Sequence, residues 1–261
     1  MEVSLSGRGA VITGGSKGLG LAMALRFAES GADVAILARR PEVLEEAKAG
    51  IAHVAKGRRV AAIACDVSKA EQVEAGYKQA MEALGKIDIV VNNAGTSRTG
   101  AFATITDAVW QEDFDLKLFA AIRLTRLAWP QMIERGWGRV INVLNIGAKA
   151  PRAGGAPTAV SRAAGMALTK ILAGEGAKHN VLVNALLVGQ IDSDQWVRRH
   201  IAAGANEPYA EYIKGLATEI PLGRLGKAEE FAATACFLCS DHAGYITGTA
   251  INVDGGRSPV V

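Results

Sequence analysis

The chain has 261 residues, with 29 Lys and Arg against 26 Asp and Glu, which gives a formal net charge of +3 at pH 7. Hydrophobic residues make up 49%, charged residues 21% and aromatic residues only 5%. This composition excludes a disordered, coiled-coil or collagen-like protein, and the mild, dispersed charge gives no indication of nucleic-acid binding. The length fits one large domain over residues 1–261.

Apolar, β-rich runs alternate with helical patterns along the whole chain. This order predicts an α/β fold, with a parallel sheet covered by helices on both faces. The predicted strands are Gly9–Thr13, Val34–Ala38, Val60–Cys65, Ile87–Val91, Val140–Leu144, Val181–Leu187 and Ala250–Val253. Helices are predicted at about 18–30, 41–55, 69–84, 106–135, 157–178 and 227–239. Residues 190–221 have weaker periodicity and predict a partly helical flap over the strand ends.

Three cysteines, an odd number, argue against a disulfide framework and favour a reducing, cytoplasmic location. The N-terminal residues have neither the basic nor the apolar region of a signal peptide, and no window is apolar enough to predict a membrane span. Cys236 and Cys239 form a CxxC, but their spacing on an amphipathic helix predicts two buried thiols rather than a redox pair. The histidines show no ligand spacing, so no metal site is predicted.

A glycine-rich turn, TGGSKGLG, occupies residues 13–20 between the first predicted strand and the first predicted helix. Glycines at this point let the chain bend and bring backbone N–H groups close to a pyrophosphate at the helix N-terminus. A glycine-rich turn without a ligand is the alternative. The predicted nucleotide-binding residues here are Gly14, Ser16, Lys17, Gly18, Leu19 and Gly20.

Two arginines follow the second predicted strand, where a site selective for NAD would have an acidic residue for the ribose 2′-hydroxyl. Arg39 and Arg40 suit a 2′-phosphate instead, because a guanidinium binds phosphate oxygens in a bidentate geometry. The alternative is that one or both are solvated at the start of a helix. The sequence therefore predicts NADP(H) as the cofactor.

Three further motifs add to this turn: Asp66-Val67, Asn92-Asn93-Ala94-Gly95, and the ending Thr247 to Gly256. As a set they resemble the short-chain dehydrogenase/reductase family over essentially the whole chain. The resemblance implies a doubly wound Rossmann fold with a seven-stranded sheet and a homodimer or homotetramer. It also implies that Asp66 and Val67 flank the adenine, that Asn93, Ala94 and Gly95 line the inner cofactor wall, and that Ile191 approaches the carboxamide.

The family's chemistry rests on a tetrad of Asn, Ser, Tyr and Lys, and this chain departs from it at all four positions. The corresponding residues are Lys117, Asn145, Thr158 and Arg162. No tyrosine in the chain begins a Tyr-x-x-x-Lys. We take these four as the candidate catalytic residues, with Arg162 also expected to hold the nicotinamide ribose.

The replacements change the chemistry available to the site. The aliphatic hydroxyl of Thr158 is a far weaker acid than a phenol, and Arg162 does not deprotonate and so cannot relay protons. Asn145 can donate a hydrogen bond to a carbonyl, and burial beside a cofactor would lower the pKa of Lys117. Each also has a plain structural alternative: Lys117 paired with Asp113 and facing water, Asn145 capping a loop, Thr158 starting a helix, and Arg162 solvated.

Three functions remain open at this point. The first is NADP(H)-dependent reduction of a carbonyl or oxidation of an alcohol, with Lys117, a bound water or a flap tyrosine as proton donor. The second is a non-redox isomerase, hydro-lyase or carbon–carbon lyase that uses Lys117 as base or Schiff-base amine. The third is a catalytically silent NADP(H)-binding protein.

The expected partner is a small-molecule substrate, and neither nucleic acid nor membrane is indicated. Trp196, Tyr209, Tyr212 and Ile213 of the flap offer an apolar wall. Arg198, Arg199 and His200 offer contacts to an anion. These residues suit an apolar ketone and an acidic substrate equally.

Overall fold

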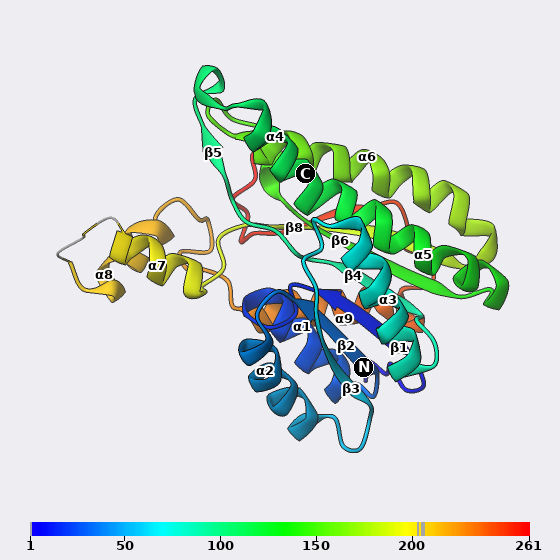
Figure 1. Cartoon of the computed structure of the whole chain (residues 1–261). Coiled ribbons are helices and arrows are strands. Elements are labelled where there is room, and N and C mark those ends of the chain that lie inside the picture. The colour runs from blue at the N-terminus through cyan, green and yellow to red at the C-terminus, as the bar shows by residue number, and fades with distance from the viewer. Residues whose placement is uncertain (1, 203, 205–206) are drawn as a thin grey trace.

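The computed structural model describes residues 2–202, 204 and 207–261 and contains a seven-stranded, all-parallel sheet (Figure 1). Across the sheet the strands are β3 (Val60–Ala64), β2 (Asp33–Ala38), β1 (Gly9–Thr13), β4 (Ile89–Asn92), β6 (Gly138–Asn145), β8 (Val181–Val188) and β9 (Ala250–Val253). This order confirms the predicted doubly wound Rossmann fold, because the chain moves outward from β1 in one direction and then outward from β4 in the other.

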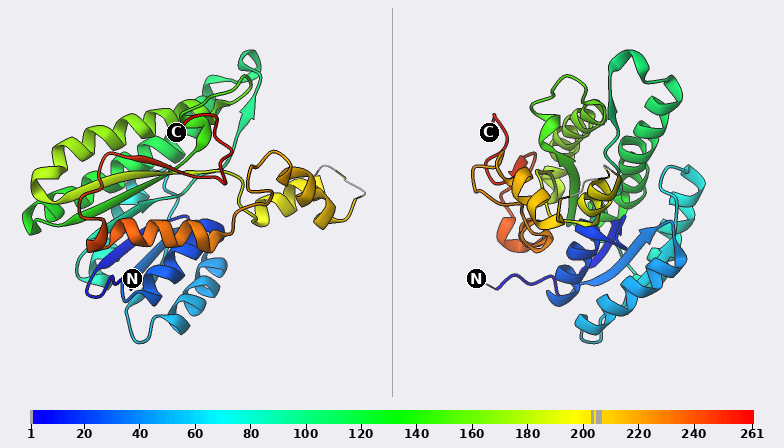
Figure 2. Two further views of the ribbon diagram at one scale, coloured as in Figure 1. Left: turned by 180° about the vertical axis from the view of Figure 1, so that it is seen from behind. Right: turned by 90° about the vertical axis from the view of Figure 1, so that its left-hand side faces the viewer.

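Helices cover both faces of the sheet (Figures 1 and 2). One layer holds α1 (Gly18–Glu29), α2 (Pro41–Val54) and α9 (Ala228–Cys239), and the other holds α3 (Ala70–Leu84), α5 (Ala120–Arg135) and α6 (Thr158–Gly176). Each layer encloses its own apolar core, with Phe27 and Phe231 in the first and Leu124 and Met132 in the second, all with at most 1% of their surface exposed. The strands are apolar along their length because both faces are buried.

The predicted helix over 106–135 is interrupted. It consists of α4 (Asp107–Phe114), one π-helical turn, η2 (Asp115–Phe119), and α5. In this turn the N–H of Ala120 bonds to the carbonyl oxygen of Asp115, five residues earlier. A π-helical turn usually occurs as a single turn inside an otherwise regular helix, and the sequence pattern did not reveal it.

Other differences from the predicted elements are small. The fourth strand begins at Ile89 rather than Ile87, and the third ends at Ala64. A two-stranded antiparallel ribbon of β5 (Thr99–Gly100) and β7 (Ala156–Pro157) was not predicted, because two-residue strands carry no periodic signal.

The flap after β8 is partly helical, as predicted. It contains α7 (Asp194–Ala202) and α8 (Tyr209–Ala217) and projects from the carboxyl edge of the sheet (Figure 1). A bridge between Ile191 and Gly226 closes its base. The side chain of Arg198 lies outside the described residues.

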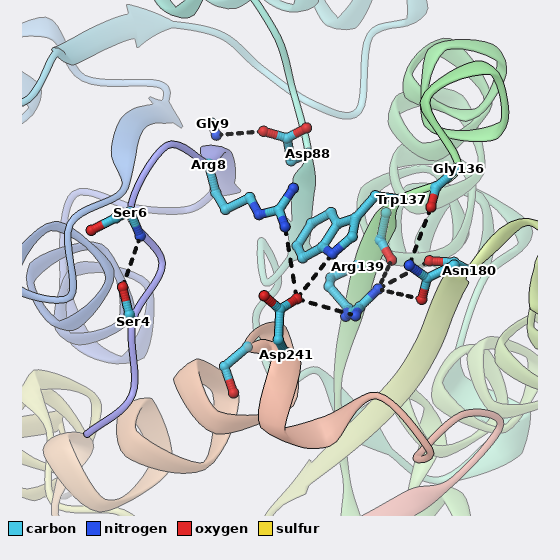
Figure 3. A network of polar contacts seen from close by, with 12 residues as sticks. Ser4, Ser6, Arg8, Gly9, Asp88, Gly136, Trp137, Arg139, Asn180 and Asp241 are labelled. Atoms are coloured by element: carbon cyan, nitrogen blue, oxygen red, sulfur yellow. Dashed lines mark hydrogen bonds and ion pairs between the residues drawn. The ribbon is translucent and has the colours of Figure 1, made fainter. Parts of the chain in front are cut away.

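The amino edge of the sheet carries a charged network (Figure 3). Arg139, only 2% exposed, lies against the ring of Trp137, and Arg8 lies against the same ring. Asp241 accepts a hydrogen bond from Trp137 Nε1 at 3.1 Å and forms ion pairs with both arginines. Cations stacked on an indole and paired with a carboxylate hold this edge together.

Cys236 and Cys239 are free and fully buried on α9, which confirms two core thiols. Burial raises the pKa of both thiols. Within the residues that the structure describes, no helix has the length and apolar character needed to cross a membrane.

Candidate active site

The glycine-rich turn lies at the carboxyl end of β1 and leads into α1. Gly14 and Gly18 have φ of +64° and +55°, a conformation that favours glycine. A Cβ on Gly20 would lie 2.2 Å from the carbonyl oxygen of Gly14, so only glycine fits there. No protein atom lies within 4 Å of a Cβ built on Gly18, the first residue of α1, so the turn leaves open space there for a pyrophosphate.

The loop after β4 forms the wall beside this turn. Thr13 Oγ1 accepts hydrogen bonds from the backbone N–H groups of Asn93 and Ala94, at 2.9 and 3.0 Å. Asn93 in turn donates its side-chain amide to the carbonyl oxygens of Thr13 and Gly14. These bonds fix the ends of β1 and β4 to one another, and a Cβ on Gly95 would lie 2.6 Å from Arg162 Nη2.

A cavity of about 630 Å³ runs from the glycine-rich turn past the ends of β6 and β8 to the flap. Its volume suits a cofactor-sized ligand with a small substrate. The predicted site residues that line it are Gly14, Lys17, Gly18, Leu19, Asn93, Ala94, Gly95, Asn145, Thr158, Arg162 and Ile191. Ser16, Gly20, Arg39, Arg40, Asp66, Val67 and Lys117 are outside this lining.

Arg39 and Arg40 follow β2 and are exposed, with Arg40 as the N-cap residue of α2. Neither guanidinium has a hydrogen bond or ion pair to another described residue. Asp66 accepts bonds from the N–H and hydroxyl of Ser68, which fixes the loop after β3, and Val67 is buried beside it. The 2′-phosphate and adenine positions implied by the sequence are therefore at the carboxyl ends of β2 and β3.

Lys117 lies inside the protein, with 1% of its side chain exposed. Its Nζ donates to Asp113 Oδ2 at 2.5 Å and to Thr158 Oγ1 at 2.8 Å. Asp113, equally buried, also accepts a 2.6 Å bond from Ser161. The expected pairing with Asp113 is present, but the pair faces α6 rather than water.

The pKa of Lys117 is lowered to about 8, chiefly by burial and also by the positive charge of Arg162, while the hydrogen bond to Asp113 opposes the shift. Desolvation also lowers the pKa of Arg162 to about 10. Arg162 donates to the carbonyl oxygen of Val143 in β6. At neutral pH both groups are cations, with Arg162 in the lining of the cavity and Lys117 behind it.

The hydroxyl of Thr158 is fully occupied. It donates to the carbonyl oxygen of Arg98 at 2.7 Å and accepts from the Arg98 N–H and from Lys117, at 2.9 and 2.8 Å. A hydroxyl has one donor and two acceptor positions, so this one has no position left for a substrate oxygen. Thr158 joins the loop after β4 to α6 through these bonds.

Asn145, at the end of β6, differs from Thr158 because its side chain has no hydrogen-bond partner. Its amide makes no hydrogen bond to any described residue, and Oδ1 is buried without a partner beside the cavity. Gln190, 8% exposed and not predicted as a site residue, lines the same cavity with an unpartnered Oε1. Buried unpaired polar atoms carry a free-energy penalty, so a ligand is the natural partner of both side chains.

A second, small space lies behind Lys117 and Arg162. Its volume of about 10 Å³ is close to that of one water-sized probe, and Asn92 and Asn142 line it too. Asn92 Oδ1 and Arg162 Nε are buried without protein partners.

Sequence reasoning named Asp113 only as a pairing partner of Lys117, from its position one helical turn earlier, and missed Ser161 and Gln190. Ser161 and Gln190 carried no signal, since a serine within a helix and a glutamine after a strand are ordinary. The geometry nevertheless fits a dinucleotide: Gly14 and Gly18 line the cavity without side chains, no protein atom lies within 4 Å of a Cβ built on Gly18, and Gln190 has an unpaired oxygen beside the cavity.

Comparisons with known proteins agree with this geometry. Residues 14–258 match the family model described as "Enoyl-(Acyl carrier protein) reductase". "Dehydrogenase/reductase SDR family member 4" of Oryctolagus cuniculus is 36% identical over 97% of this chain and 94% of that protein.

Two solved structures are similar to the whole chain. L-sorbose reductase from Gluconobacter frateurii, complexed with NADPH and L-sorbose, is 36% identical, with a TM-score of 0.95 over 100% of both chains. An NADPH-bound short-chain oxidoreductase from Pseudomonas aeruginosa PAO1, described as containing an atypical catalytic center, is 38% identical, with a TM-score of 0.92 over 99% of both chains. Sequence, fold and site geometry agree, and the chain belongs to the short-chain dehydrogenase/reductase family.

Proposed function

We propose that the protein is an NADP(H)-dependent oxidoreductase that reduces a carbonyl compound, or oxidises the corresponding alcohol, without a tyrosine as proton donor. The observation that carries this proposal is the unpartnered amide of Asn145, which faces a cavity that begins at the glycine-rich turn. An amide in this position can donate to a carbonyl oxygen and stabilise the charge that develops on it.

The preference for NADP(H) rests on Arg39 and Arg40, which are exposed at the end of β2 and have guanidinium groups available for a 2′-phosphate. The NADPH complexes of the two similar structures support it. A fluorescence titration with NADPH and NADH tests it. We expect NADPH to bind at least about tenfold more tightly, Arg39→Ala to abolish the preference, and Arg58→Ala, at another exposed arginine, to retain it. Equal binding of the two nucleotides by the wild type would contradict the assignment.

NADPH, when bound, supplies the hydride to the carbonyl carbon. Asn145 donates its Nδ2–H to the carbonyl oxygen, and the positive charges of Arg162 in the cavity wall and of Lys117 behind it stabilise the alkoxide. Thr158 has no free hydrogen-bonding position, and Tyr209 and Tyr212 are outside the cavity lining. A water in the cavity therefore donates the proton and leaves a hydroxide, which exchanges with solvent.

In this proposal Lys117 is a positioning residue that acts through Thr158 and Arg162. Lys117→Met is expected to lower kcat about tenfold and leave the KM for NADPH unchanged. The kcat of the wild type should fall as the pH rises through about 8, because Lys117, with a pKa of about 8, then loses its charge. This fall should be absent in Lys117→Met. A direct proton donor at position 117 would instead give a loss of several orders of magnitude.

The two alternatives give different outcomes. A Schiff base would require a free amine in the cavity, whereas Lys117 is paired with Asp113 and lies outside the lining. Borohydride trapping of a carbonyl compound on Lys117 would establish the lyase. Tight NADPH binding without oxidation by any compound of a broad carbonyl panel would establish a silent binding protein. The homodimer or homotetramer and the cytoplasmic location stay predictions.

A further inference from the structure

The cavity has a strongly one-sided charge. Among the described residues that line it, five are cationic, Lys17, Arg152, Arg162, Arg199 and Arg257, and none is acidic. Their positions separate into two groups. Lys17 follows β1 and Arg162 lies behind the nicotinamide position, so the phosphates and ribose of the cofactor account for these two.

The other three arginines come from different parts of the chain. Arg152 follows β6, Arg257 follows β9, and Arg199 is on α7 of the flap. In the sheet, β6 and β9 are on the opposite side of β4 from β1, so Arg152 and Arg257 are at the end of the cavity remote from the glycine-rich turn. Arg199 lies over the ring of Trp196, 4.8 Å from its centroid, which holds the flap arginine beside the opening.

The arginines at this end are incompletely paired. The guanidinium of Arg152 has no hydrogen bond to another described residue. Arg257 donates Nη2 to Glu219 at 2.5 Å, but its Nε is buried and has no partner. Glu219 pairs with Arg257 alone, and its pKa is lowered by the hydrogen bond and charge of Arg257 and by the charge of Arg152. An excess of positive charge remains at the end of the cavity that the cofactor does not reach.

We propose that this end of the cavity, formed by Arg152 and Arg257 with Arg199 at its opening, binds a carboxylate or phosphate group of the substrate. Accordingly, the substrate is an anionic carbonyl compound, with its carbonyl at Asn145 and its acid group at the arginines. Guanidinium groups bind both kinds of acid through paired N–H donors. This inference rests on the proposed function for the reaction, but the anion site itself stands on geometry.

The first test uses the full-length protein saturated with NADPH and titrated with malonate or inorganic phosphate at constant ionic strength, with cofactor fluorescence as the signal. We expect saturable binding that is weakened at least about tenfold by Arg152→Ala and by Arg257→Ala. Arg58→Ala removes an exposed arginine beside β3 and serves as the control, with binding expected within about twofold of the wild type. The affinity for NADPH should be unchanged in every variant.

Glu219→Gln adds a second test, in which anion binding is expected to become stronger rather than weaker. If Glu219 competes for Arg257, removal of its charge should tighten binding of the probes, whereas a merely structural ion pair would give no tightening. Stronger binding of malonate would identify a carboxylate substrate, and stronger binding of phosphate a phosphate ester. Absence of saturation, or displacement of NADPH by the probes, would overturn the anion site.

Turnover separates this inference from the proposed function. Pyruvate is compared with methyl pyruvate, and dihydroxyacetone phosphate with dihydroxyacetone. A charged member should have at least about tenfold higher kcat/KM than its neutral partner, and Arg257→Ala should abolish the difference. Anion binding without reduction of any carbonyl would contradict the oxidoreductase alone. Equal or faster reduction of the neutral partners would contradict the anion site alone.

Discussion

The two edges of the sheet differ in whether their buried polar and charged side chains have partners within the protein. At the amino edge, Asp88 is 1% exposed and accepts from the Gly9 N–H while it pairs with Lys86 and Arg135. At the carboxyl edge, four of the seven buried side-chain atoms without partners in the described chain belong to cavity residues, namely Asn145, Arg162, Gln190 and Arg257. Arg139 Nε belongs to the amino edge.

This difference separates stability from function. Groups that are paired within the protein lower the free energy of the fold, and groups that are left unpaired raise it until a ligand binds. Substitutions at the amino edge should therefore reduce stability. Those at the unpaired groups of the carboxyl edge should reduce activity and leave the fold intact.

The largest effect is expected from Arg139→Ala. This change removes a buried side chain that fills space beside Trp137 and donates to the Asn180 carbonyl oxygen. We expect a loss of about 3 kcal/mol in the free energy of unfolding, measured with urea. Arg58→Ala, at an exposed site, should change it by less than about 0.5 kcal/mol. Equal losses in the two variants would remove the structural role assigned to the amino edge.

Asn145→Ala should have the reverse profile. Loss of the amide donor is expected to lower kcat about 100-fold with the best carbonyl substrate. The melting temperature should stay the same or rise, because a buried unpaired oxygen is removed. Asn145→Asp keeps the shape of the side chain but loses the donor, and it should be as slow as the alanine variant. If the aspartate variant keeps full activity, hydrogen bonding by Asn145 is not the cause.

The charge behind the cavity gives a smaller, pH-dependent effect. The pKa of Lys117 falls from 10.5 to about 8 on folding, so the unfolded chain binds more protons than the folded one between these values. Stability should rise with pH across this interval, by at most about 1.4 kcal/mol per pH unit for one proton.

Urea unfolding from pH 7 to 11 measures this dependence as the difference between wild type and Lys117→Met. Because Lys117→Met alone leaves Asp113 buried without a cation, the double variant with Asp113→Asn provides a second comparison. Lys48→Met, at an exposed lysine, is the control and should keep the wild-type dependence. A difference that does not vary with pH would mean that Lys117 keeps its ordinary pKa.

The smallest effect is expected at the CxxC on α9. Burial raises the pKa of both thiols, so neither forms a thiolate readily. A thiol titration of the native protein should find slow reaction at both positions, and reductant should leave activity unchanged. Rapid loss of two thiols under mild oxidation would identify a redox pair instead.

Much of the fold could be predicted from the sequence, because buried parallel strands are short apolar runs and the glycine-rich turn marks the first crossover. The site was harder. Lys117 and Thr158 are 41 residues apart, and only the tertiary structure shows that the lysine donates a hydrogen bond to the threonine hydroxyl. Spacing indicated that Lys117 and Asp113 pair, but the direction in which the pair faces depends on a helical turn that the apolar pattern does not reveal.

That π-helical turn, η2, makes the placement of the buried charge depend on the length of the chain. Since an α-helix advances by about 100° per residue, one residue more or less between α4 and α5 would rotate the two segments against each other by that angle. Asp113 would then turn away from Ser161 while α5 kept its packing against the sheet. Deletion of Leu118 or Phe119 would thus dismantle the charge network behind the cavity without changing any of its side chains.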